Sequence, residues 1–133
     1  MTEKFDLYIV DDDPKIIEVM LSMLAPYELK IKTFTDPIEA LKQLTDTPAR
    51  VVFLDYNMPT LNGKNFIIRM SERYLFQYCT TFLVTAQQFD QMNIDLLHTL
   101  GFSKVIQKPF TEKDLIGAIS EVVGVMKKKK MSA

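Results

Sequence analysis

The stretch Leu7-Tyr8-Ile9-Val10-Asp11-Asp12-Asp13-Pro14 places a short apolar run directly before three aspartates and a proline. The run does not alternate with polar residues, which is typical of a strand buried on both faces of a parallel sheet. Asp13 before Pro14 marks a helix start, because aspartate caps the first turn and proline suits the first helical position. The stretch therefore predicts a strand that leads through an acidic turn into a helix.

The same order of strand and helix recurs along the whole chain. Strand-like runs lie at 7–10, 29–34, 51–54, 81–84 and 104–106. Apolar residues repeat at the spacing of a core-facing helical stripe in five sets: Ile16, Met20 and Leu24; Ile38, Leu41 and Leu44; Phe66, Ile67 and Met70; Met92, Leu96 and Leu100; and Leu115, Ala118, Ile119, Val122, Val123 and Met126. The alternation predicts an α/β fold, a doubly wound (βα)5 three-layer sandwich around a five-stranded parallel sheet.

The composition is that of one domain. The chain has 133 residues, 47% hydrophobic and 25% charged, so a second full domain has no room. Cys79 is the only cysteine, which excludes an intrachain disulfide and a multi-cysteine zinc site. No apolar run approaches the ~20 residues that span a bilayer, and the first residues lack the layout of a signal peptide. We therefore expect a cytoplasmic protein without a membrane contact.

The net charge of −1 divides into an acidic body and a basic end. Four of the 16 basic residues are Lys127–Lys130, so the other 12 basic and 17 acidic residues give −5. An acidic body argues against direct nucleic-acid binding. We interpret the lysine run as the solvated end of the last helix, where cations interact favourably with the helix dipole.

Polar residues stand where the predicted strands end. Ligands of open α/β sheets bind beyond the carboxyl ends of the strands, and these positions hold Asp11, Asp12 and Asp13 after the first strand, Asp55 after the third, Thr85 at the end of the fourth and Lys108 after the fifth. Its role as a helix cap explains the presence of Asp13 without a part in a site. The other side chains are predicted to meet around one shallow crevice.

These residue types suit a divalent cation and a phosphoryl group. Clustered carboxylates repel one another, and a hard cation with oxygen ligands, Mg²⁺ or alternatively Mn²⁺, removes that repulsion. The cation and Lys108 would neutralise phosphoryl oxygens, Thr85 would donate a hydrogen bond, and one carboxylate would attack phosphorus. The first turn lacks the glycines that bind a nucleotide phosphate, which argues against a nucleotide site.

Four motifs together resemble the receiver domains of bacterial two-component response regulators. They are Ile9-Val10-Asp11-Asp12-Asp13-Pro14, Leu54-Asp55-Tyr56-Asn57-Met58-Pro59 with Asn62-Gly63, Val84-Thr85-Ala86, and Lys108-Pro109-Phe110. Each motif is short, but all four stand in order at strand ends. The resemblance covers residues 4–127 and leaves 128–133 as a basic tail or the start of a linker. It implies a flavodoxin-like fold with strand order 2-1-3-4-5.

The resemblance also implies roles for the site residues. Asp55 would accept a phosphoryl group from a kinase phosphohistidine. Asp12, Asp55 and the backbone carbonyl of Asn57 would bind Mg²⁺ directly, and Asp11 would bind it through water. Lys108 would pair with the phosphoryl oxygens. Such a protein is a signalling module that catalyses its own phosphorylation and dephosphorylation, and it turns over no separate substrate.

Signal output is expected at a surface away from the site. Thr85 would move toward the phosphoryl group and report it to the face formed by the fourth helix, fifth strand and fifth helix. The Lys108–Pro109 bond is usually cis in the family. Val105 stands where the family usually has Tyr or Phe, so we predict a muted or differently routed conformational change.

The expected partners follow from the same resemblance. A sensor histidine kinase or a phosphotransfer protein would supply the phosphoryl group, and a downstream protein or a missing output domain would receive the signal. The output face could also join two copies of the chain in a homodimer.

Two other functions stay open at this point. Asp11-Asp12-Asp13 contains the D-x-D pattern of haloacid-dehalogenase-like phosphatases, with Asp11 as nucleophile and Asp13 as general acid, although Lys15 stands where that family has Thr or Val. The other alternative is a pseudo-receiver, which keeps the fold as a binding module and does not depend on phosphorylation.

Overall fold

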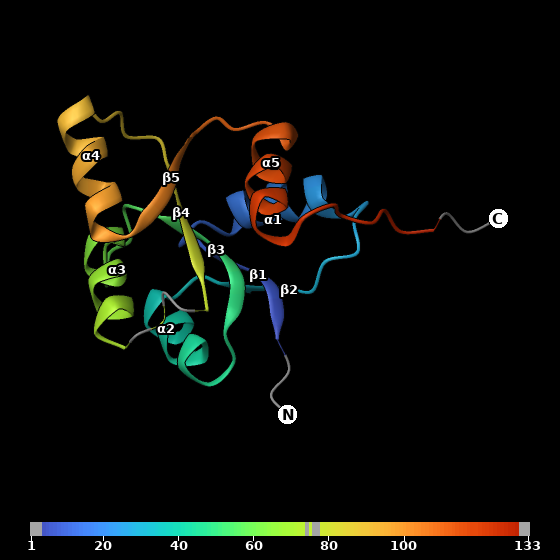
Figure 1. The fold of residues 1–133 in the computed structure, drawn as a ribbon, viewed down its shortest axis with the longest axis horizontal. Helices are drawn as coiled ribbons and strands as arrows, with labels where there is room; N and C mark the ends of the chain where they lie inside the picture. Colours follow the sequence, from blue (N-terminus) through green and yellow to red (C-terminus); the bar gives the residue numbers. More distant parts are fainter. Residues whose placement is uncertain (1–3, 74, 76–77, 131–133) are drawn as a thin grey trace.

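The computed structural model describes residues 4–73, 75 and 78–130, and it contains each predicted strand and helix (Figure 1). The elements are β1 (Phe5–Val10), α1 (Pro14–Leu24), β2 (Ile31–Phe34), α2 (Pro37–Asp46), β3 (Ala49–Asp55), α3 (Gly63–Glu72), β4 (Thr80–Thr85), α4 (Gln91–Leu100), β5 (Phe102–Gln107) and α5 (Glu112–Val123). None of the helices in these ranges is long and apolar enough to cross a membrane.

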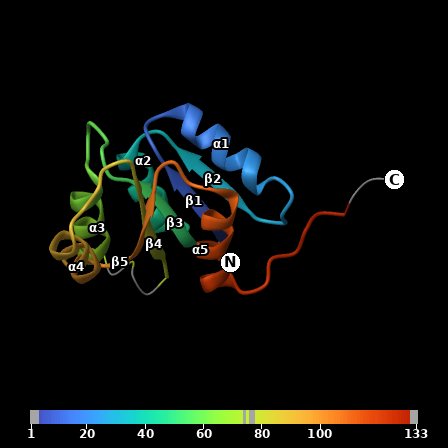
Figure 2. The ribbon, with the colours of Figure 1, turned by 90° about the horizontal axis from the view of Figure 1, so that it is seen from above.

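The strands form one parallel sheet in the order β2-β1-β3-β4-β5. Helices α2, α3 and α4 cover one face of this sheet, and α1 and α5 cover the other (Figures 1 and 2). The sheet is therefore the middle of three layers. Both the doubly wound (βα)5 sandwich and the flavodoxin-like strand order are confirmed.

Helix starts follow the capping signals of the sequence. The carboxylates of Asp13 and Asp36 each accept a hydrogen bond from the backbone N–H two residues further on, and each is followed by proline at the first helical position. Thr111 and Asp114 form a reciprocal capping box at the start of α5. Each cap stabilises its helix by about 1 kcal/mol and so fixes where the chain leaves a strand end.

The core consists of two apolar layers, one on each face of the sheet. All residues of β3 except Arg50 are buried, because helices cover both faces of this central strand. The same burial explains why the strand runs show no polar alternation. Tyr8 in β1 is also fully buried, and its hydroxyl donates a hydrogen bond to the carbonyl of Thr47 at 2.5 Å, so no polar atom is left unpaired there.

Only one residue of the apolar stripe predicted for the fourth helix, Leu100, packs against the core. Met92 is 79% exposed and Leu96 is 48% exposed, whereas Leu97 is only 4% exposed. The helix is anchored to the sheet through Leu97, which the predicted stripe did not include. The prediction was wrong for Met92 and Leu96, because α4 packs through a narrow contact and leaves these two apolar side chains in solvent.

The lysine run is not the end of α5. This helix ends at Val123, and Gly124 follows with a φ of 81°. The chain then continues extended: Glu28 N–H donates to the Lys127 carbonyl at 2.8 Å, and Lys129 N–H donates to the Pro26 carbonyl at 2.7 Å. The tail therefore pairs with the segment between α1 and β2, where an antiparallel bridge joins Tyr27 and Lys128. Residues 131–133 of the expected tail lie outside the described residues.

Candidate phosphoryl-acceptor site

The strand register brings the predicted site residues to one edge of the sheet. Val10 pairs with Leu54 and Asp55 pairs with Val84. Asp11, the residue after β1, therefore lies beside Asp55 at the end of β3. Thr85 pairs with Gln107, and Lys108 is the next residue after that pair. The parallel arrangement thus brings the ends of β1, β3, β4 and β5 to one edge of the sheet, as the sequence predicted.

Three carboxylates converge at this edge. Carboxylate oxygens of Asp11, Asp12 and Asp55 all lie within 4.8 Å of one another. Asp11 and Asp55 are buried, with exposed fractions of 2% and 7%, whereas Asp12 is exposed. One oxygen of Asp11 accepts a hydrogen bond from the backbone N–H of Asp13 at 2.9 Å, which fixes its orientation. The site is therefore a cluster of two buried carboxylates and one exposed carboxylate, which we call the acidic hollow.

Lys108 is the cation that enters this hollow. Its ammonium donates to Asp11 Oδ2 at 3.1 Å and to Asp55 Oδ1 at 3.4 Å. Burial lowers the pKa of Lys108, but the two carboxylates raise it more, and the net pKa is raised. The lysine is therefore charged at neutral pH and stands between the two buried acids.

One lysine does not neutralise three carboxylates. Burial, and then the charge of Asp11, raise the pKa of Asp55 from 3.8 to about 6, against the opposing effect of Lys108. The ionised carboxylate is thus costly in this hollow. An all-oxygen donor set with excess negative charge fits a hard divalent cation, Mg²⁺ or Mn²⁺.

Thr85 lies fully buried at the end of β4. Its hydroxyl accepts a hydrogen bond from the backbone N–H of Gln87 at 3.0 Å, and its carbonyl accepts one from the backbone N–H of Lys108 at 2.7 Å. The second bond ties the end of β4 to the residue that enters the acidic hollow. The peptide bond between Lys108 and Pro109 is cis, as the resemblance implied.

The loop after Asp55 is closed by the residues of the Asn62-Gly63 motif. Asn62 caps α3, accepting a hydrogen bond from the Asn65 N–H at 2.9 Å, and Gly63 N–H donates to the Tyr56 carbonyl at 2.8 Å. A Cβ on Gly63 would lie 3.1 Å from the Tyr56 Cα. The close approach of the two backbones therefore favours glycine, because a side chain here would push the neighbouring atoms a few tenths of an ångström away. Asn57 is exposed in this loop, two residues after Asp55.

Two features near the site were not predicted from the sequence. The side chain of Gln107 donates to the carbonyls of Thr85 and Gln87, and the rings of Tyr56 and Phe89 meet edge to face at 5.4 Å between centroids. A glutamine on an edge strand and isolated aromatic residues are common, so the sequence carries no signal for either contact. Both join the segment that follows Thr85 to another strand end.

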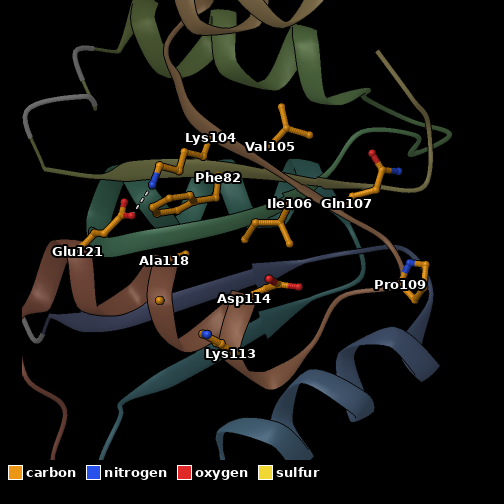
Figure 3. Close-up of a pocket in the computed structure, with 11 residues that line it drawn as sticks. Phe82, Lys104, Val105, Ile106, Gln107, Pro109, Lys113, Asp114, Ala118 and Glu121 are labelled. Carbon is orange, nitrogen blue, oxygen red and sulfur yellow. Dashed lines mark hydrogen bonds and ion pairs between the residues drawn. The ribbon is translucent and has the colours of Figure 1, made fainter. Parts of the chain in front are cut away.

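A groove lies beside the site, between β5 and α5 (Figure 3). Its volume is about 610 Å³, and Phe82, Ile106, Pro109 and Ala118 contribute to its lining. An ion pair between Lys104 and Glu121 joins its two sides. None of the three clustered carboxylates lines it, so the groove and the acidic hollow are separate features.

Comparison with known proteins places this architecture in a family. A family model described as the response regulator receiver domain matches residues 7–120. The chain is 29% identical over 130 residues to a probable chemotaxis protein CheY of Rhizobium etli, covering 96% of this chain and 98% of that protein. It is 30% identical over 125 residues to the response regulator SaeR of Staphylococcus aureus, covering 92% of this chain but 52% of that protein.

Solved structures agree on the fold. The chemotaxis protein CheY4 of Vibrio cholerae has a TM-score of 0.78 at 20% identity, with 92% of this chain and 99% of that chain covered. A receiver domain of a Francisella response regulator has a TM-score of 0.79 at 20% identity, with 90% and 94% covered. The family match over residues 7–120, together with the strand order β2-β1-β3-β4-β5, shows that the chain belongs to the response regulator receiver domains of two-component signalling.

Proposed function

We propose that Asp55 is the phospho-acceptor of this receiver, taking a phosphoryl group from the phosphohistidine of a sensor histidine kinase or a phosphotransfer protein. The observation that carries the proposal is the placement of Asp55 beside a second buried carboxylate, Asp11, with the ammonium of Lys108 in contact with both. An acceptor needs a fixed carboxylate oxygen and a cation ready for the incoming oxygens, and this hollow supplies both.

In the transfer, a carboxylate oxygen of Asp55 attacks phosphorus. The bond between phosphorus and the donor's imidazole nitrogen breaks, and its electron pair stays on that nitrogen, which then takes up a proton. Lys108, within reach of Asp55 in the resting protein, turns to a phosphoryl oxygen. Thr85 donates its hydroxyl hydrogen to another phosphoryl oxygen. The product is an acyl phosphate, which water later hydrolyses to restore the carboxylate.

Mg²⁺ completes the proposed site. Asp12, Asp55 and the backbone carbonyl of Asn57 would bind the ion directly, and Asp11 would bind it through water. When bound, the ion screens the charge of the carboxylates and of the phosphoryl oxygens. The support on this chain is the set of three carboxylates within 4.8 Å, together with the raised pKa of Asp55. Mn²⁺ satisfies the same donors.

The output surface of the proposal is the face formed by α4, β5 and α5. Met92 and Leu96 are exposed on α4, one helical turn apart, and they would supply apolar area to a contact on this face. A downstream partner, or a second copy of the chain in a homodimer, would bind there. Val105 offers no aromatic ring on this face. We therefore expect the conformational change on phosphorylation to reach the face by another route.

The alternatives have less support. A phosphatase would need Asp13 as a general acid, but its carboxylate accepts the Lys15 N–H as a helix cap. A pseudo-receiver would not need the placement of Lys108 between Asp11 and Asp55. We also propose that the receiver unit comprises residues 4–127 in the cytoplasm, with residues 128–133 as a basic tail or the start of a linker.

Phosphorylation by a small donor tests the proposal. Wild type incubated with acetyl phosphate and Mg²⁺ should gain one phosphoryl group by intact-mass analysis, and Asp55→Asn should gain none. Asp46→Asn, the same change at an exposed helix end, is the matched control and should behave like wild type. Equal labelling of Asp55→Asn and wild type would refute the assignment.

A further inference from the structure

We propose that Gln107 is a positioning residue, which holds the segment between β4 and α4 in its unphosphorylated arrangement and opposes the movement of Thr85. This inference rests on the proposed phosphorylation of Asp55. The segment comprises residues 86–90 and is named the β4–α4 segment. It leaves β4 at Thr85, next to the acidic hollow.

The side chain of Gln107 bridges two carbonyls of one turn. It stands at the end of β5, beside the chain that leaves β4 (Figure 3). Its Nε2 donates to the Thr85 carbonyl at 3.0 Å and to the Gln87 carbonyl at 3.3 Å. The Thr85 carbonyl also accepts the Lys108 N–H at 2.7 Å. The turn from Thr85 to Gln87 is therefore held from the neighbouring strand at two points.

The hydroxyl of Thr85 belongs to the same set of bonds. It accepts the Gln87 N–H at 3.0 Å, and Thr85 is completely buried. Movement of the Thr85 hydroxyl toward a phosphoryl group on Asp55 breaks its bond with the Gln87 N–H, and in our proposal the backbone of residues 85–87 shifts with it. The bonds from Gln107 then have to lengthen or break, because hydrogen bonds weaken steeply away from their preferred geometry. Gln107 thus favours the resting arrangement.

Residue 105 cannot exert this restraint. Val105 and Ile106 point to opposite faces of β5 (Figure 3), and Val105 packs against the apolar layer under α2, α3 and α4. Val105 has no side-chain hydrogen-bonding group. Gln107, two residues further along the strand, has the length and the donors to reach the moving turn. The restraint on the β4–α4 segment is therefore polar and lies at residue 107.

Binding of beryllofluoride, a stable mimic of a phosphoryl group on a carboxylate, measures this restraint. Gln107→Met keeps the length of the side chain and removes both donated bonds. In the presence of Mg²⁺, we expect the half-saturating beryllofluoride concentration to fall about fivefold, which corresponds to roughly 1 kcal/mol of lost resting-state stabilisation. Ser103→Ala, at an exposed position of the same strand, is the matched control and should leave the concentration unchanged.

The sign of the effect separates the proposal from a purely structural role. Damage to the site would weaken beryllofluoride binding, whereas loss of the restraint strengthens it. In wild type, beryllofluoride should also shift the side-chain NH₂ signals of Gln107 in NMR spectra, which tests the proposal without any variant. Unshifted signals, or a half-saturating concentration for Gln107→Met that is unchanged or higher, would overturn it. If wild type does not bind beryllofluoride at all, the proposed function fails, and this inference fails with it.

Discussion

Asp55 carries a charge that its own surroundings disfavour. Burial and the neighbouring Asp11 raise its pKa to about 6, and Lys108 compensates only in part. In the folded, metal-free protein this carboxyl therefore holds its proton more tightly than in the unfolded chain. The consequence is a pH dependence of stability opposite to that of most carboxylates, whose pKa values folding lowers.

We predict that metal-free Asp55→Asn is more stable than metal-free wild type near neutral pH, and that the difference shrinks as the pH falls. The folded pKa of Asp55, about 6, lies above its ordinary value of 3.8. The folded state therefore binds the extra proton between these values, and the penalty of the ionised carboxylate is relieved there. The rise in pKa sets a ceiling of roughly 3 kcal/mol, and we expect about 1 kcal/mol after screening by water.

Urea denaturation of both proteins in the presence of a chelator measures this difference. Comparison with Asp55→Asn cancels the titration of the other acids. A difference in unfolding free energy that stays constant from about pH 7 to about pH 4 would contradict the raised pKa. Restoring Mg²⁺ at neutral pH should stabilise wild type more than the variant, because binding to the folded state alone adds to its stability.

Among individual site residues, the sequence predicts the acidic ones well and their polar neighbours poorly. Asp11, Asp12 and Asp55 could be placed because strand ends of a parallel sheet share one edge. Gln107 could not, because its role depends on which backbone carbonyls lie within reach of its side chain. Its neighbour Lys108 could be predicted because it follows the fifth predicted strand and stands in Lys108-Pro109-Phe110, one of the four motifs that together carry the resemblance.

Among the elements, α4 shows where helical periodicity is insufficient. The spacing of Met92, Leu96 and Leu100 is that of a core-facing stripe, yet two of these residues are exposed and the buried anchor is Leu97. Periodicity identifies the helix, but not which of two adjacent apolar stripes meets the sheet. That choice depends on how the helix docks on its neighbours, which single-sequence reasoning does not reach.

We predict that Leu97→Ala lowers the unfolding free energy by about 3 kcal/mol, because it removes a buried side chain and leaves a cavity. Leu96→Ala, the same chemical change one residue earlier, should cost less than about 1 kcal/mol, because Leu96 is half exposed. Chemical denaturation of the two variants makes the comparison. Equal losses, or a larger loss for Leu96→Ala, would mean that α4 docks in the orientation suggested by its apolar stripe.

For the whole molecule, the basic tail is the largest departure from expectation. Lysines 127–129 return along residues 26–28 through two backbone hydrogen bonds, and the Lys128 ammonium lies over the Tyr27 ring, 5.9 Å from its centroid. The segment after α5 is thus packed against the segment after α1. A run of like charges gives no indication of such a partner, because the pairing uses backbone groups that every residue has.

We predict that ending the chain after Gly124 speeds hydrogen exchange of the Glu28 amide by about fivefold and lowers the unfolding free energy by about 1 kcal/mol. The amide loses its acceptor, the Lys127 carbonyl. Lys128→Ala in the full chain is the control, because it removes only the contact with the ring and keeps the backbone pairing. Identical exchange of Glu28 in the truncated and full-length chains would show that the tail does not pair in solution.

The topology itself follows from the sequence to a large extent. Five apolar runs alternating with five amphipathic stretches restrict the chain to a doubly wound sheet, because parallel strands need crossover helices and right-handed crossovers. The order β2-β1-β3-β4-β5 does not follow from alternation alone. It was inferred from the resemblance carried by the four motifs, each of which stands where a strand leaves the sheet.

The central claim is that Asp55 alone carries the phosphoryl group, and chemical trapping tests it most directly. Borohydride reduces an aspartyl phosphate to homoserine, so peptide mass spectrometry after incubation with acetyl phosphate and Mg²⁺ identifies the modified residue. The account predicts homoserine at position 55 and aspartate at positions 11, 12 and 13. Homoserine at any of those three positions, or none in the peptide that contains residue 55, would contradict it.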